Sequence, residues 1–307
     1  MQLHGIFYNS DGVLRSGWRI AVFIVALAVF GFGIGIPVYA VLAAFQKEIP
    51  PGSAIYLIVM SALSLAAPIS AAWICGRFLE RLPFKAFGAS FSRGWFNHFT
   101  AGILLGAASI TLAVVIALVF GDFSLKLNPA GSNAIFTSMA ISFALFAVAA
   151  AFEESLFRGY ILQTLSRAGL AWLAILLTAV FFMAVHLGNP ETNLIAAINT
   201  GLAGVWFGIA YLRTRDLWFA WGIHLMWNWM QGAVYGIEVS GLTNLAAQPF
   251  FNELDNGPTW LTGGKYGIEG GVAATISLLV TIAAVTYSPE FEPDPEMVAL
   301  TNPKPKD

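Results

Sequence analysis

The sequence predicts an all-α membrane protein, a polytopic bundle of about eight transmembrane helices that forms a single integral membrane domain over residues 1–307. Composition is the first reason, because 58% of the residues are hydrophobic and 10% are charged. Soluble domains contain about 25% charged residues. The mean hydropathy of +0.74 agrees with this assignment. A chain with this balance cannot hide its apolar side chains in one water-soluble core.

The spacing of the apolar segments is the second reason. A helix needs about 20 apolar residues to cross a bilayer, and the chain has apolar segments of roughly this length at residues 20–44, 54–75, 99–120, 134–152, 170–187, 194–212, 217–234 and 272–287. The first segment is too long for the core of a cleaved signal peptide, so we expect it to remain as a membrane anchor. The helical pattern of the fourth continues to about residue 167, which predicts a helix longer than the membrane requires.

The distribution of basic residues predicts the topology. Three lysines lie in loops that follow odd-numbered segments, namely Lys47, Lys126 and Lys265. The other Lys and Arg residues lie at the N-terminus or after even-numbered segments: Arg15, Arg19, Arg77, Arg81, Lys85, Arg93, Arg158, Arg167, Arg213, Arg215, Lys304 and Lys306. Cytoplasmic loops are enriched in Lys and Arg. We therefore expect a multi-pass protein of the plasma membrane with both termini in the cytoplasm and the 235–271 loop outside.

The remaining composition excludes some partners. A net charge of −2 argues against nucleic acid as a partner. The single cysteine, Cys75, lies in an apolar segment, where it is best explained as a small buried side chain. Residues 288–307 are rich in Pro, Asp and Glu, and we expect them to form a disordered acidic tail.

Three charged residues interrupt the fourth apolar segment, at Glu153, Glu154 and Arg158. Glu154 and Arg158 are four residues apart, so they share a helix face and can form an ion pair. Glu153 lies about 100° around the helix and needs a partner from another helix. Ionisable residues inside a membrane are costly and usually functional. Glu153 is therefore the first candidate for a catalytic group, and Glu154 and Arg158 are expected to support it.

His186 is the first candidate partner for Glu153. Measured from a turn near Ala168, Glu153 lies 15 residues before the turn and His186 lies 18 residues after it. At 1.5 Å per residue these positions are about 22 and 27 Å along antiparallel helices, so the two side chains reach a similar depth. Phe182 precedes His186 by one turn, and we expect it to contribute packing.

His224 and Asn228 lie one turn apart on the seventh apolar segment, so both face the same way. The predicted site thus combines a carboxylate, two imidazoles and a carboxamide from three helices. A carboxylate and a His can activate water, while a second His and an Asn can donate to the oxyanion that forms on a peptide carbonyl. The set of Glu153, His186 and His224 could instead bind zinc. The residues alone leave both mechanisms open.

These motifs resemble those of the CAAX-protease and bacteriocin-processing (CPBP, or Abi) family of intramembrane proteases, of the prokaryotic type. Glu-Glu-x-x-x-Arg occurs as Glu153 to Arg158, Phe-x-x-x-His as Phe182 and His186, and His-x-x-x-Asn as His224 and Asn228. The resemblance covers about residues 134–230 and implies that this region is the catalytic core. It further implies that Glu153 and His186 activate water and that His224 and Asn228 form the oxyanion hole.

We therefore predict an intramembrane endopeptidase that hydrolyses a membrane-associated substrate, either a prenylated CAAX-type protein or a leader peptide. Its partners would be membrane lipid and the peptide or protein substrate. Zinc would leave only Glu154 as the general base, and a carboxylate held by Arg158 is a poor base, so we favour a mechanism without an obligatory metal. The alternatives are a non-catalytic scaffold or bacteriocin-immunity protein that uses the same cavity, and a transporter. The oligomeric state is left open.

Overall fold

The computed structural model describes residues 4–9, 12–50, 52–243 and 245–302. Within these residues, all the predicted apolar segments are helical, and they lie in α2 (Ser16–Ala44), α3 (Ala54–Leu79), α4 (Trp95–Phe120), α5 (Ser132–Glu154), α7 (Ala171–His186), α8 (Leu194–Thr214), α9 (Leu217–Trp229) and α11 (Val272–Tyr287). Five described helices are long and apolar enough to cross a membrane, while α7 and α11 are shorter apolar helices. The predicted helical membrane bundle is confirmed.

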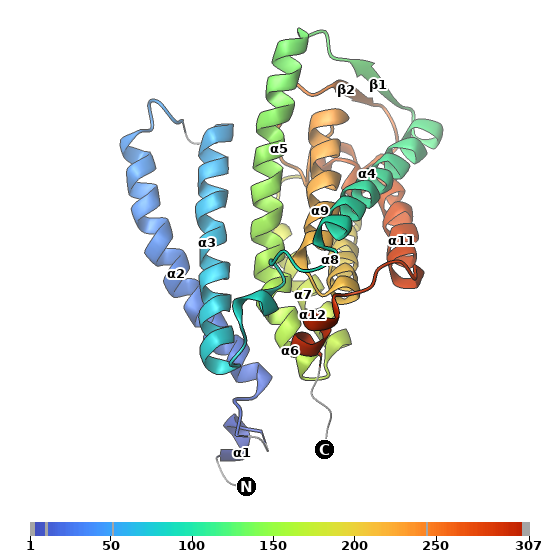
Figure 1. Cartoon of the computed structure of the whole chain (residues 1–307). Coiled ribbons are helices and arrows are strands. Elements are labelled where there is room, and N and C mark those ends of the chain that lie inside the picture. The colour runs from blue at the N-terminus through green and yellow to red at the C-terminus, as the bar shows by residue number, and fades with distance from the viewer. Residues whose placement is uncertain (1–3, 10–11, 51, 244, 303–307) are drawn as a thin grey trace.

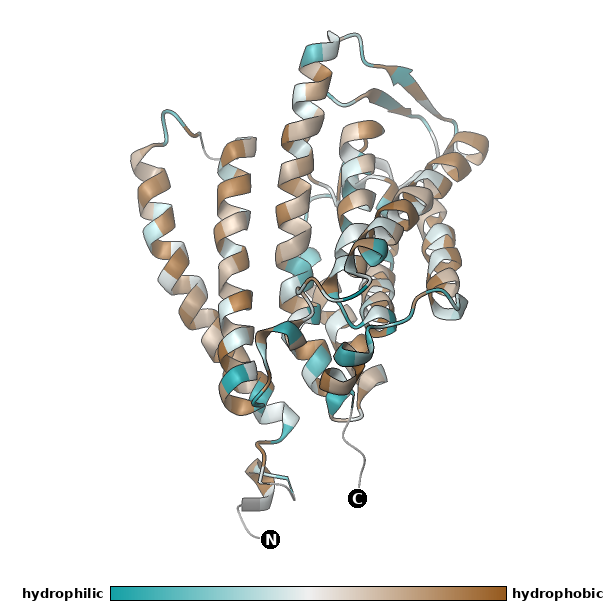
Figure 2. Ribbon diagram, viewed as in Figure 1, coloured by the Kyte–Doolittle hydropathy of each residue, from teal (hydrophilic) through white to brown (hydrophobic). Residues whose placement is uncertain are grey.

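Short elements connect these helices. They are α1 (His4–Phe7), the 3₁₀ helix η1 (Phe84–Phe87), β1 (Phe123–Leu127), β2 (Phe251–Asp255), α10 (Thr259–Thr262), the 3₁₀ helices η4 (Gly264–Tyr266) and η5 (Ile268–Gly270), and α12 (Pro295–Thr301). The two strands pair antiparallel, with Phe123 opposite Asp255. The resulting ribbon lies at the end of the molecule opposite to both termini (Figure 1). Hydrophobic residues cover much of the long helices, while hydrophilic residues gather in the ribbon and the connecting segments (Figure 2).

A π-helical segment interrupts the longest helix directly after Glu154. The helix Ser132–Arg167 is continuous, but η2 (Ser155–Leu162) is π-helical, and α6 (Gln163–Arg167) completes the helix. The predicted extension to residue 167 is thus confirmed, whereas the π-helical segment was not predicted. π-Helical turns are rare and occur frequently at functional sites.

Helix α9 is fixed by direct backbone contact with α4. A Cβ atom added at Gly102 would lie 2.4 Å from the Phe219 carbonyl oxygen, and one at Gly106 would lie 2.4 Å from that of Ile223. On the other side of the contact, a Cβ atom at Gly222 would lie 2.6 Å from the Phe99 carbonyl oxygen. Glycines of this kind let membrane helices approach closely. The contact sets the position of α9, which continues into a π-helical segment, η3 (Met230–Val234).

Helices α2 and α3 form a pair at the side of the bundle (Figure 1). Only Phe23 and Leu42 are buried in α2, so most of its apolar surface faces outward. The carboxylate of Glu80, fully buried at the end of α3, pairs with Arg19 of α2 at 2.6 Å and with Arg167 of α6 at 2.5 Å. The Arg19 pair joins α2 to α3, and the Arg167 pair connects the two helices to the main bundle.

The C-terminal segment differs from the disordered tail that we expected. Residues 295–301 form α12, which Asp294 caps by accepting a hydrogen bond from the Glu296 amide. The segment is also tied to the bundle, because Phe291 packs on Phe219 with ring centroids 4.5 Å apart. Acidic composition alone did not reveal these contacts, which depend on residues distant in sequence. Residues 303–307, with Lys304 and Lys306, lie outside the described residues.

Candidate active site

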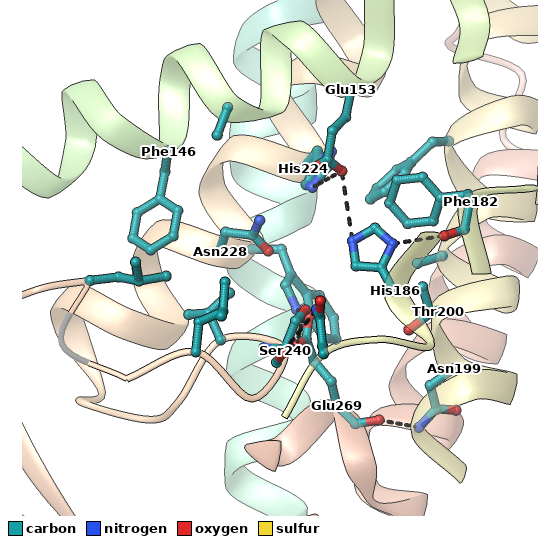
Figure 3. Close-up of a pocket in the computed structure, with 18 of the residues that line it drawn as sticks. Phe146, Glu153, Phe182, His186, Asn199, Thr200, His224, Asn228, Ser240 and Glu269 are labelled. Carbon is teal, nitrogen blue, oxygen red and sulfur yellow. Dashed lines mark hydrogen bonds and ion pairs between the residues drawn. The ribbon is translucent and has the colours of Figure 1, made fainter. Parts of the chain in front are cut away.

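The predicted site residues meet in one cavity (Figure 3). Glu153 is next to the last residue of α5, His186 is the last residue of α7, and His224 and Asn228 lie one turn apart on α9. The cavity has a volume of about 410 Å³ and is lined by all four residues and by Phe182. The three motifs, separated by up to 75 positions in the sequence, therefore occupy one place in the structure.

The carboxylate of Glu153 faces both imidazoles. Its Oε2 atom lies 3.9 Å from Nε2 of His186 and 3.8 Å from Nε2 of His224. These distances are too long for direct hydrogen bonds. Among the described residues, this buried oxygen has no hydrogen-bond partner. The expected agreement in depth between Glu153 and His186 is confirmed, and Glu153 holds an acceptor that the protein itself does not use.

The backbone of Phe182 orients His186. Nδ1 of His186 lies 2.7 Å from the Phe182 carbonyl oxygen, one turn earlier in α7. A carbonyl can only accept, so Nδ1 carries a proton and donates it. Nε2 is then left facing Glu153. Phe182 also packs against the His186 ring with a centroid distance of 4.6 Å. Phe182 therefore orients the imidazole through its carbonyl as well as providing the expected packing.

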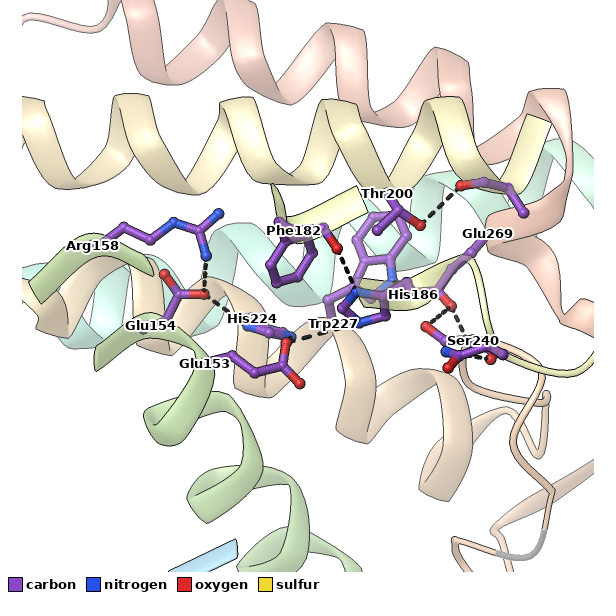
Figure 4. A network of polar contacts seen from close by, with 12 residues as sticks. Glu153, Glu154, Arg158, Phe182, His186, Thr200, His224, Trp227, Ser240 and Glu269 are labelled. Carbon is purple, nitrogen blue, oxygen red and sulfur yellow. Dashed lines mark hydrogen bonds and ion pairs between the residues drawn. The ribbon is translucent and has the colours of Figure 1, made fainter. Parts of the chain in front are cut away.

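His224 is oriented by the buried pair that the sequence predicted. Arg158 donates to Oε1 of Glu154 at 3.1 Å, which confirms the pairing of these two residues. The same carboxylate oxygen lies 2.8 Å from Nδ1 of His224. The His224 ring stacks on Phe207 at a centroid distance of 4.7 Å and an interplanar angle of 16°. Glu154 thus connects Arg158 to His224, a link that helix periodicity did not reveal (Figure 4).

The guanidinium of Arg158 is enclosed by hydrogen-bond acceptors and aromatic rings. Its side chain is fully buried, and a second hydrogen bond of 3.1 Å goes to the Gly204 carbonyl oxygen of α8. Three aromatic rings surround it, with centroids 5.6 Å away for Phe157, 4.9 Å for Phe182 and 5.1 Å for Phe207. A cation over aromatic faces gains electrostatic stabilisation. Arg158 therefore belongs to a rigid support behind His224 and does not line the cavity.

A second polar group in the cavity was not predicted. Glu269 lies in η5 and lines the cavity with Ser240, Asn199 and Thr200. In the sequence Glu269 is one of several acidic residues of a long loop, so nothing distinguished it. From the sequence alone, Asn199 and Thr200 are two polar residues in the sixth apolar segment, with nothing to indicate a cavity. Their role in the cavity depends on how the loop folds back over α8.

The cavity lies in the half of the bundle remote from the termini. Its lining residues come from the first two turns of α3 and α11, the C-terminal parts of α5, α7 and α9, the middle of α8 and the loop after α9. These parts of the helices face the end of the molecule that carries the β-ribbon (Figure 1). The segments that join the helices at the other end contribute no described residue to the lining.

In the part of the chain that the structure describes, no group of three or more His, Cys, Asp and Glu side chains could hold a metal ion. The geometry instead shows one carboxylate oxygen facing two imidazole nitrogens, each imidazole being oriented through its other nitrogen. Both imidazoles are thus held in place by the protein itself.

The bundle and its cavity define the class of protein: a multi-pass helical membrane protein with a cavity in which one carboxylate faces two imidazoles. Residues 135–230 match the model of a family described as type II CAAX prenyl endopeptidase Rce1-like. The matched region contains every candidate residue from Glu153 to Asn228. The match confirms the predicted resemblance to the CPBP family of CAAX proteases, and it supports a membrane endopeptidase as the general activity. No curated protein matches the chain.

Proposed function

We propose that the protein is an intramembrane endopeptidase that uses Glu153 and His186 to activate water. The observation that carries this proposal is the buried Oε2 atom of Glu153, which has no hydrogen-bond partner among the described residues and faces Nε2 of His186 at 3.9 Å. A water molecule placed to the side of this line can contact both atoms at the usual distance of about 2.8 Å. Its two hydrogens would go to Glu153 and His186, leaving a lone pair for attack on a carbonyl carbon.

The proton transfers follow from this arrangement. Glu153 takes a proton from the water while the water oxygen bonds to the substrate carbonyl carbon. The tetrahedral intermediate then loses its C–N bond, and Glu153 returns the proton to the leaving nitrogen. His186 keeps its orientation throughout, because its Nδ1 remains bonded to the Phe182 carbonyl. One carboxylate thus serves first as base and then as acid.

His224 and Asn228 are assigned to the oxyanion. The Glu154 carboxylate at 2.8 Å from Nδ1 favours a positive charge on the His224 ring. Nε2 can then donate to the oxygen that becomes negative. Asn228 lies one turn further along α9 and lines the same cavity, which provides a second donor. Losing one such donor typically slows an enzyme about 10²–10³-fold.

Cleavage of peptides by the full-length protein in lipid vesicles tests the proposal. Internally quenched peptides with apolar flanks provide the substrates, and mass spectrometry of the products identifies the bond that is cut. We expect Glu153→Gln to lose about 10²–10⁴-fold in rate. Glu191→Gln is the matched control, because Glu191 is exposed and does not line the cavity. Equal turnover by Glu153→Gln and the control would refute the role of Glu153. Absence of cleavage by the unmodified protein would instead favour a scaffold that binds a peptide or lipid.

Metal analysis of the same active preparation tests the second part of the proposal. We expect activity to survive metal removal by chelation. Stoichiometric zinc whose removal and restoration switch activity off and on would instead assign Glu153, His186 and His224 as ligands. In that case Asn228→Ala should have little effect on turnover, whereas the oxyanion assignment predicts a slower turnover with little change in peptide binding.

A further inference from the structure

The end of the cavity away from Glu153 offers hydrogen-bond acceptors and a negative charge. We call it the acceptor end and define it by Glu269, Ser240 and Asn199, which line the cavity beyond His186 (Figures 3 and 4). The mechanism above uses none of these residues. The carboxylate of Glu269 faces the region of the cavity where the substrate chain would continue past the cleaved bond.

Several hydrogen-bond donors at this end are already used by the protein. Nε1 of Trp227 donates to Oε1 of Glu269 at 3.2 Å, and the amide and hydroxyl of Ser240 donate to Oε2 at 2.7 and 2.8 Å. The amide group of Asn199 donates to the carbonyl oxygens of Glu269 and Gly271. Thr275 donates to Oδ1 of Asn199, which fixes the orientation of that amide. Oε1 of Glu269 accepts one hydrogen bond, from Trp227, and can accept a second from a ligand.

The charges of the cavity also favour a ligand that donates hydrogen bonds and carries a positive charge. Among the described lining residues there are two carboxylates, Glu153 and Glu269, and no Lys or Arg. The nearest guanidinium of the site, that of Arg158, is committed to Glu154 and Gly204 and does not line the cavity. A substrate carboxylate at the acceptor end would meet a like charge without a cationic partner among the described lining residues. A cationic side chain would instead gain a charge-assisted hydrogen bond.

The length of α8 gives the spacing between the two ends. Phe207 stacks on His224 at the catalytic end, and Asn199 binds the backbone of Glu269 at the other. These residues are eight positions apart in one helix, which corresponds to about 12 Å. An extended peptide rises about 3.3 Å per residue. The acceptor end therefore meets the side chain about three or four residues from the bond that is cut.

We propose that Glu269 selects substrates with a basic side chain three or four residues from the cleaved bond and disfavours a free carboxylate there. The inference rests on the proposed peptidase function. It names the substrate class: an internal cationic segment, as in a leader-type peptide, and not a chain that ends with its carboxylate at this position.

Matched peptides test the proposal. Once the cleaved bond is known, peptides are compared that differ only in Lys, Met or Glu at the third or fourth residue to either side. We expect kcat/KM for the best Lys peptide to exceed that of its Met counterpart by about tenfold or more, with the Glu peptide poorest. Equal values for all three would overturn the proposal while leaving the peptidase function intact.

Two variants separate selectivity from loop structure. Glu269→Gln should lose the preference between Lys and Glu peptides. Ser240→Ala loses one hydrogen bond to Glu269 but keeps the charge, so it should retain the preference. A purely structural role for Glu269 would lower turnover of all peptides in proportion in both variants, which would contradict the assignment.

Peptide binding gives a readout that does not depend on catalysis. The affinity of each peptide is measured for the Glu153→Gln protein in lipid nanodiscs, and the Lys peptide should bind about tenfold more tightly than the Glu peptide. If the unmodified protein cleaves none of the peptides but this difference in binding remains, the peptidase function fails and the charge selectivity stands. If binding shows no difference, the charge selectivity fails whatever the activity.

Discussion

Replacing Glu154 and Arg158 singly and together should separate their effect on stability from their effect on activity. The side chains of Arg158 and Glu154 are 0% and 1% exposed, so neither charge can be solvated when its partner is removed. Breaking a buried ion pair from one side costs about 3–5 kcal/mol. Arg158→Met should incur this cost, since it also leaves the Gly204 carbonyl without its donor. Glu154→Gln should likewise destabilise the protein, because Arg158 keeps its charge.

The double variant should be less destabilised than the sum of the singles, by about 1–3 kcal/mol, because no unpaired charge remains. Its activity should nevertheless stay low. Nδ1 of His224 loses its charged partner at 2.8 Å, and a charge-assisted hydrogen bond contributes about 1.5–3 kcal/mol. This corresponds to a rate loss of about 10–100-fold. Stability is thus partly restored while turnover is not.

Thermal unfolding in detergent can be followed with a thiol-reactive dye. Cys75 is the only cysteine and is buried, so its labelling reports loss of the fold. Peptide cleavage by the same four proteins gives the second measurement. Strictly additive losses of stability would refute the buried pair as a unit. Recovery of full activity in the double variant would refute the orienting role of Glu154.

Three further predictions concern other parts of the fold. Gly106→Ala places a Cβ atom 2.4 Å from a carbonyl oxygen of α9. We therefore expect the free energy of unfolding to fall by about 1–3 kcal/mol, measured as a lower unfolding temperature. Unchanged stability would mean that α4 and α9 are not in backbone contact. Burial and a neighbouring carboxyl group raise the pKa of Glu253 to about 9 from 4.5. The folded state then binds the proton more tightly, so stability should fall as pH rises from about 4.5 to about 9. Glu253→Gln should flatten this part of the stability curve, and an identical pH dependence in both proteins would contradict the assignment. Asn252 and Glu290 are exposed, and each can be replaced by cysteine once Cys75 has been replaced. A cysteine at residue 252 should be labelled from outside the cell and one at residue 290 from inside. The reverse pattern would overturn the predicted topology.

Helix periodicity predicted the parts of the site that depend on one or two helices. The spacing of Glu154 and Arg158 predicted their ion pair, which the structure shows at 3.1 Å. Counting residues from the turn near Ala168 predicted that Glu153 and His186 reach similar depths, and their side chains lie 3.9 Å apart. Both predictions needed only the fixed rise and rotation of a helix.

The remaining features depend on contacts that no local pattern encodes. The bond between Glu154 and His224 requires the packing of α9, which glycine contacts with α4 determine. The π-helical segment after Glu154 has no periodic signal of its own. Glu269 reaches the cavity only because η5 is held by Asn199, Trp227 and Ser240. Its place in the sequence, among other acidic loop residues, gave no reason to single it out.

The position of the cavity within the bundle decides which compartment supplies the substrate. The loop after α9 and the ends of α3, α7, α9 and α11 that lie towards the β-ribbon line much of the cavity, away from both termini. With the arginine-rich end in the cytoplasm, as the charge distribution predicts, the cavity faces the exterior of the cell. Such an enzyme would act on polypeptides after export. Reversed insertion would give the same residues access to newly made cytosolic proteins.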